Sequence, residues 1–68
     1  MKLIDLLRNV YLQTKFTLMD YNSDIIYINN EYAFTTKGNI RKIFKPHLSH
    51  EIVFILADNK DKLKIYVR

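Results

Sequence analysis

Residues 51–68 read EIVFILADNKDKLKIYVR, and the hydrophobic pattern of this stretch decides the fold class. Residues 51–57 are almost continuously apolar, which is typical of an inner strand that is covered on at least one face. Residues 58–61 are polar turn formers. From residue 62 to residue 68, polar and apolar side chains alternate, as in a strand with one buried and one solvated face. The stretch therefore predicts two strands joined by a turn.

The first part of the chain predicts a helix and another pair of strands. Apolar residues recur at the spacing of an amphipathic helix over residues 2–11. From Thr14 the period falls to two, which indicates a strand that ends at the turn-rich residues 20–24. A second strand then covers residues 25–28. Beyond it two alternatives stay open: residues 29–31 either bend the chain or continue the strand with a bulge.

A short second helix, residues 38–45, precedes the two C-terminal strands. Helical spacing returns after Gly38, and Pro46 is expected to end the helix because proline cannot continue it. The order helix, strand, strand, helix, strand, strand predicts an α+β two-layer sandwich. In this fold a four-stranded, mainly antiparallel sheet carries both helices on one face.

The chain is predicted to be a single domain, residues 1–68. Residues 2–30 and 38–68 align as two αββ units, since their helices match at an offset of about 37 and their strands at about 38. This similarity suggests an internal duplication. The alternative is that any two amphipathic units of similar length align this well.

The composition excludes several classes of protein. A chain of 68 residues forms one core with little interior for a deep pocket, so we expect no small-molecule substrate. The absence of cysteine excludes disulfides, thiolate zinc sites and thiol nucleophiles, and a single glycine excludes a phosphate-binding loop. No apolar run reaches the roughly 18 residues of a membrane span. We therefore expect a cytoplasmic protein with no cofactor and no membrane partner.

Two histidines are the only candidates for metal chemistry. His47 and His50 lie three residues apart beside Glu51, and on a helix they would share one side with this carboxylate. Pro46 argues against that helix, so a loop with two surface histidines is the favoured interpretation. Ser23 and Ser49 lie in turns without a partnered base. The sequence therefore predicts neither a metal site nor an enzyme.

Basic residues are concentrated in the second half of the chain. Residues 1–36 contain three basic and four acidic residues, so the whole formal net charge of +4 comes from residues 37–68. Cations beside an aromatic ring such as Tyr66 are typical of nucleic-acid binding, in which the cations contact phosphates and the bases stack on the ring. A solvated edge strand guarded by lysines is the alternative. The candidates for nucleic-acid binding are Lys37, Arg41, Lys42, Lys45, Lys62, Lys64 and Arg68.

Tyrosine and apolar residues on outward strand faces indicate a second kind of surface. Alternation places Val53 and Ile55 on one face of their strand and Phe54 on the other, and we expect the Val53 face, like Met19, to point outward. A sheet with helices on only one side would then expose enough apolar surface to need a partner. Tyrosine often anchors such interfaces. The candidates for protein binding are Tyr21, Tyr27, Tyr66, Ile25, Val53 and Ile55.

Three segments carry a resemblance to a group of phage proteins. They are Lys2-x-x-Asp5-Leu6-Leu7, Phe16-x-Leu18-x-Asp20 followed by Tyr21-Asn22, and Leu63-x-Ile65-x-Val67. The chain resembles short proteins of bacteriophages and prophages in low-GC Gram-positive bacteria, which have no agreed activity. The resemblance implies a small accessory protein that docks on a host protein. Inhibitors of bacterial defence nucleases, including anti-CRISPR proteins, come from this group.

The leading hypothesis is a non-catalytic phage or mobile-element module that docks on a host protein through the open sheet face, with inhibition of a defence nuclease as one form of that role. The first alternative is a small nucleic-acid-binding protein that uses the basic strand and helix. The second is a structural homodimer. Salt separates the first two, because phosphate contacts weaken steeply with rising salt and apolar docking does not.

Overall fold

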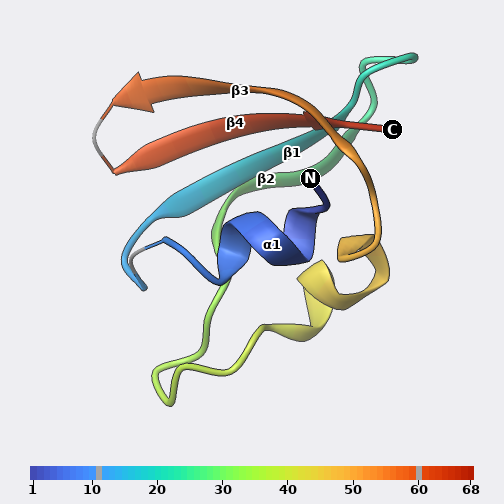
Figure 1. Ribbon diagram of the computed structural model, residues 1–68. Helices are drawn as coiled ribbons and strands as arrows, with labels where there is room; N and C mark the ends of the chain where they lie inside the picture. Colours follow the sequence, from blue (N-terminus) through green and yellow to red (C-terminus); the bar gives the residue numbers. More distant parts are fainter. Residues whose placement is uncertain (11, 60) are drawn as a thin grey trace.

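The computed structural model describes residues 1–10, 12–59 and 61–68 (Figure 1). A helical piece precedes each pair of strands, which confirms the predicted α+β class. None of the described helices is long and apolar enough to cross a membrane. The elements are the α-helix α1 (Leu3–Leu7), the strands β1 (Lys15–Asp20) and β2 (Ile26–Tyr32), the 3₁₀ helix η1 (Lys42–His47), and the strands β3 (Ile52–Asn59) and β4 (Lys62–Val67).

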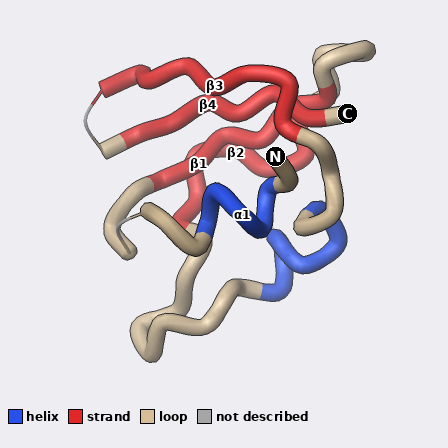
Figure 2. The backbone as a smooth tube through the Cα atoms, in the orientation of Figure 1, coloured by secondary structure: helices blue, strands red, loops and turns tan. Residues whose placement is uncertain are grey.

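The four strands form one mixed sheet in the order β2-β1-β4-β3 (Figure 2). The outer pairs, β1 with β2 and β3 with β4, are antiparallel hairpins. The two central strands, β1 and β4, run parallel, with Lys15 opposite Lys62 and Asp20 opposite Val67. The expected antiparallel arrangement therefore holds within each hairpin but not where the hairpins meet. β1 is central and β3 is at an edge, so the two hairpins are not equivalent in the sheet, and the duplication stays a prediction.

The core lies between one face of the sheet and the two helical pieces, which are on the same side of it (Figure 1, Figure 2). Phe44 of η1 meets Phe16 of β1 edge to face, with ring centroids 6.0 Å apart. Both rings are completely buried. The buried cluster consists of Leu3, Leu7, Phe16, Leu18, Ile28, Ala33, Phe44, Ile65 and Val67.

The first helix is shorter than the predicted residues 2–11. It begins where the Lys2 N–H donates a hydrogen bond to the Asp5 carboxylate (3.0 Å). It ends at Leu7, and the side-chain amide of Asn9 donates to the Asp5 carbonyl (2.9 Å). Asparagine competes with the backbone for such bonds and disfavours a continued helix. Tyr11, at the end of the predicted range, lies outside the described residues.

The second helix also differs from the predicted residues 38–45. It is a 3₁₀ helix that begins at Lys42, and Pro46 lies inside it. A proline removes a single N–H donor, which a helix of this length tolerates, and the Leu48 N–H still closes the last turn on the Lys45 carbonyl (3.4 Å). Before η1, Gly38 adopts a left-handed conformation with φ of 84° in a turn. The expectation that Pro46 ends the helix is therefore wrong.

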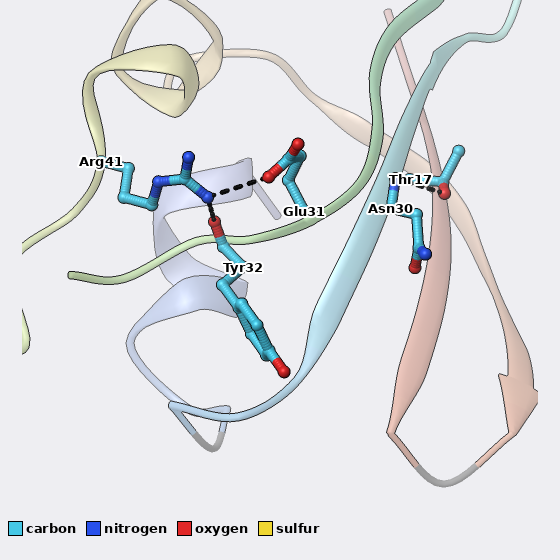
Figure 3. A network of polar contacts seen from close by, with 5 residues as sticks. All are labelled: Thr17, Asn30, Glu31, Tyr32 and Arg41. Carbon is cyan, nitrogen blue, oxygen red and sulfur yellow. Dashed lines mark hydrogen bonds and ion pairs between the residues drawn. The ribbon is translucent and has the colours of Figure 1, made fainter. Parts of the chain in front are cut away.

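β2 continues past residue 28 with a bulge, which resolves the alternative that the sequence left open. Phe16 pairs with Glu31 but Leu18 pairs with Ile28, so β2 has an extra residue between them. Asn30 takes up the irregularity with a φ of 54°. Its N–H donates to the Thr17 hydroxyl (3.1 Å) on the neighbouring strand (Figure 3).

A second bulge, at Val53, reverses the predicted faces of β3. Ile52 pairs with Val67 and Phe54 with Tyr66, so Val53 has no counterpart in β4. One extra residue moves every later side chain to the opposite face. Ile55 therefore packs against the core, whereas Phe54 is exposed. The expectation that Ile55 faces outward is wrong.

The core contact of η1 can be tested by shortening Phe44. Phe44→Ala is expected to lower the free energy of unfolding by about 3–5 kcal/mol, because it leaves a cavity beside Phe16. That loss approaches the whole stability of a domain of this size. The measurement is therefore urea unfolding of Phe44→Leu, which is expected to destabilise the domain less than Phe44→Ala. Ile43→Ala, one residue earlier and 42% exposed, is the control and is expected to cost less than about 1 kcal/mol. Equal losses in Phe44→Leu and Ile43→Ala would contradict this core.

Candidate functional site

The face of the sheet opposite α1 and η1 is called the open face here. Strand alternation defines its residues, because Phe16 and Leu18 point into the core and their neighbours in β1 point away from it. The cross-strand pairs then extend the face over the other strands. Its members are Ile26 and Tyr32 of β2, Lys15, Thr17 and Met19 of β1, Lys62, Lys64 and Tyr66 of β4, and Phe54, Leu56 and Asn59 of β3.

Three rings form an aromatic cluster at one end of the open face. Phe54 stacks on Tyr66 with centroids 4.5 Å apart and an interplanar angle of 25°. Tyr21, in the turn after β1, meets Phe54 edge to face at 5.9 Å. Met19 is buried next to Tyr66, its partner in β4. The bulge at Val53 creates this cluster, because a regular β3 would turn Phe54 toward the core.

Lysines lie beside the aromatic rings of the open face. The Lys64 ammonium is 5.5 Å from the centroid of Tyr66, and the Lys15 ammonium is 5.1 Å from that of Tyr32. Lys15 is also directly opposite Lys62 in the parallel pair. Like charges at paired positions destabilise a sheet. Among the residues that define the open face, three are lysines and none is a carboxylate.

The candidate nucleic-acid residues do not come together in one patch. Lys62 and Lys64 lie on the open face, whereas Lys42 and Lys45 lie on η1, which packs on the other face. Exposed Lys37 is in the turn before η1. Arg68 follows β4, and its backbone pairs with that of Glu51.

Arg41 has a structural role instead. Its guanidinium donates to the Glu31 carboxylate (3.1 Å) and to the Tyr32 carbonyl (3.1 Å), as Figure 3 shows. These bonds attach the segment before η1 to β2. Arg41 is therefore engaged within the chain rather than presented to a ligand.

The candidate protein-binding residues are also divided. Tyr21 and Tyr66 belong to the aromatic cluster. Ile25 is exposed in the turn before β2, and Val53 is half-buried at its bulge. Ile55 lies on the core side. Tyr27 packs on the histidines of the helical layer, because an irregularity leaves it unpaired between Ile26 and Ile28.

The candidates predicted from the sequence do not include several residues of the open face, among them Lys15, Tyr32 and Phe54. Lys15 could have been found, since it alternates with Phe16 and Leu18 in the predicted strand. Its place beside Lys62 has no signal in the sequence, because nothing there shows that β1 lies beside β4. Phe54 could not have been placed, because no local signal marks the bulge at Val53.

The two histidines pack against Tyr27 rather than form a metal centre. The ring of His47 stacks on Tyr27 at 4.7 Å, and the centroids of His47 and His50 are 5.3 Å apart. Neither buried Nδ1 atom has a hydrogen-bond partner among the described residues. Within residues 1–10, 12–59 and 61–68, no group of three His, Cys, Asp or Glu side chains lies close enough to hold a metal ion. Burial, followed by the charge of His50, lowers the pKa of His47.

No family model, no curated protein and no solved structure matches the chain. The function is therefore inferred from the open face and its side chains.

The lowered pKa of His47 predicts a pH-dependent stability. The unfolded chain binds a proton at His47 more readily than the folded chain, so stability is full above the ordinary imidazole pKa of about 6.5 and falls as the pH drops below it. We expect the urea midpoint to decrease between about pH 7.5 and about pH 5.5. His47→Phe keeps a ring on Tyr27 and is expected to flatten this decrease.

A hydrogen bond from the Ser23 hydroxyl (2.6 Å) lowers the pKa of Asp20 from its ordinary acidic value, which moves its titration further away from that range. An identical pH dependence in wild type and His47→Phe would show that His47 does not cause it.

Proposed function

We propose that the protein is a non-catalytic binding module and that its open face binds single-stranded nucleic acid. The observation that carries this proposal is the pairing of an ammonium with an aromatic ring in two places on one face, Lys15 with Tyr32 and Lys64 with Tyr66. Proteins that bind single strands combine cations for the phosphates with rings for the bases. The lack of cysteine fits action in the reducing cytoplasm.

The lysines of the open face favour an anionic ligand. Lys15 and Lys62 occupy paired positions of the central parallel strands, and Lys64 is two residues further along β4. Their mutual repulsion is a cost to the free domain. A phosphate bound between them would replace this repulsion with attraction, so binding energy is available that the free domain lacks.

The exposed rings supply the second half of the site. Tyr21 and Phe54 are exposed at one end of the face, and Tyr32 is 42% exposed near the other end. A base stacked on such a ring contributes about 1–3 kcal/mol. Bases in a duplex already stack on each other, and duplex readout needs an element that enters a groove. A sheet face with flat rings therefore suits a single strand better than a duplex.

Docking on a host protein is the second candidate, and the apolar residues of the same face favour it. Ile26 and Leu56 are 54% and 48% exposed, beside the aromatic cluster. Aromatic and apolar anchors with few carboxylates are typical of the centre of protein interfaces. The resemblance to phage accessory proteins fits this role, with a bacterial defence nuclease as one form of partner. Binding of this kind would depend little on salt.

Binding to a short fluorescent oligothymidylate tests the leading proposal. Lys15, Lys62 and Lys64 are each expected to neutralise one phosphate. A plot of the logarithm of the binding constant against the logarithm of the salt concentration should then have a slope of about −2. Affinity is then expected to fall about 20-fold between roughly 50 and 200 mM salt, measured by fluorescence anisotropy. No binding at the lower salt concentration would overturn the proposal. Salt-insensitive binding to a protein would support the second candidate.

Paired variants locate the binding surface. Lys64→Gln is expected to reduce the steepness of the salt slope by about 0.7, because one phosphate contact is lost. Tyr32→Leu keeps an apolar side chain without the ring and is expected to weaken binding at least about fivefold. Lys42→Gln, an exposed lysine of η1, is the matched control and is expected to bind like wild type. Equal effects of Lys42→Gln and Lys64→Gln would mean that the open face is not the site.

A further inference from the structure

We propose that the edge of β3 pairs with β3 of a second copy of the chain, which joins two sheets into one. The sheet has two edges, β2 and β3. An edge strand offers unpaired N–H and C=O groups to any other strand, and proteins normally protect it with bulges, charges, proline or a covering segment. The two edges of this sheet differ in how much of the strand is protected.

The β2 edge is protected in several ways. Its pairing with β1 contains two irregularities, and Asn30 adopts a left-handed conformation. Its last residue, Tyr32, has a carbonyl that already accepts a hydrogen bond from Arg41 (Figure 3). The segment after β2 is also covered, because the Arg41 N–H donates to the Ala33 carbonyl (2.8 Å). β2 is therefore a poor template for another strand.

The β3 edge has less of this protection. Its pairing with β4 also contains two irregularities, at Val53 and Asp58, but residues 54–57 between them are in regular register. β3 has eight residues, begins with six apolar ones in succession, and contains no lysine, arginine, proline or glycine. Its start is covered, since the Ile52 N–H donates to the Met1 carbonyl (2.9 Å). From Phe54 onward, no described residue pairs with its outer edge (Figure 1). Phe54 and Leu56 are 40% and 48% exposed there.

A second copy fits this edge because the pattern is self-complementary. In antiparallel pairing with Ile55 on the two-fold axis, Phe54 lies opposite Leu56 of the second copy, and Leu56 lies opposite its Phe54. Both contacts are apolar and lie on the open face. The pairing extends over residues 53–57, because the Met1 carbonyl covers the edge at Ile52. Asp58 lies beyond it, so no like charges meet across the interface. A strand without basic residues also allows two chains of net charge +4 to approach at this edge.

The pairing closes at two copies. In a dimer with two-fold symmetry, the β3 edge of each chain is occupied by the other chain. The two edges that remain free are the β2 edges, which are protected. The same axis leaves both open faces on one side, so two aromatic clusters lie next to each other across the junction. The dimer would thus double the open face, although the pairing itself depends only on β3.

Sedimentation equilibrium over a range of concentrations tests this proposal with two matched variants. Wild type is expected to dimerise. Leu56→Glu places a carboxylate opposite Lys64 within its own sheet, which preserves the fold, but opposite Phe54 of the second copy in the dimer. We expect its dimer dissociation constant to rise about tenfold or more. Ile26→Glu makes the same change on the same face at the protected edge and is expected to leave dimerisation unchanged.

Three results would overturn the proposal. The first is a monomer at millimolar concentration. The second is a dimer that Leu56→Glu does not weaken. The third is a dimer that Ile26→Glu weakens equally, which would indicate face-to-face packing of the sheets. Hydrogen exchange provides a second measurement, since edge pairing is expected to protect amides within residues 53–58 as concentration rises and to leave β2 amides unaffected. Oligonucleotide binding by a chain that stays monomeric at millimolar concentration would support the nucleic-acid proposal, while the first of these results overturns this one.

Discussion

Val53 lies between Ile52, which pairs with Val67, and Phe54, which pairs with Tyr66, so one residue of β3 has no counterpart in β4. The rest of β3 depends on this irregularity. It turns Phe54 onto the Tyr66 ring and turns Ile55 into the core. Without it, Phe54 would lie among the core residues and the open face would lose the stacked pair of Phe54 and Tyr66. A bulge that redirects a side chain is a common device next to binding sites.

The small size of the chain explains why one face stays open. A helix of five residues and a 3₁₀ helix of six can cover only one side of a four-stranded sheet. Leu3, Leu7 and Phe44 are buried on that side. A domain of this length buries only about 60% of the surface of its unfolded chain. The apolar residues on the other side therefore stay partly exposed, with Ile26 at 54%, Phe54 at 40% and Leu56 at 48%.

The sequence predicts the elements better than their geometry. Period-two alternation located β1 and β4 correctly, and helical spacing found both helical regions, because these signals depend on which local face is buried. The parallel pairing of β1 with β4 could not be predicted, since it follows from how two hairpins join across a connection. The inclusion of Pro46 in η1 and the bulge at Val53 also have no local signal. These misses matter most at the site: Lys15 meets Lys62 only through the parallel pair, and Phe54 reaches Tyr66 only through the bulge.

The proposed face and the proposed edge make different use of the same sheet. Lysine repulsion is concentrated in the centre, where Lys15 and Lys62 are paired, and charge is absent from the outer strand β3 until Asp58. Stacking two open faces would bring the central lysines of both copies together, which opposes face-to-face association at low salt. Joining β3 edges keeps those lysines apart and leaves them free for an anion. Charge placement therefore favours a dimer through the edge and a polyanion on the face, and a ligand that neutralises the lysines would stabilise the fold by mass action.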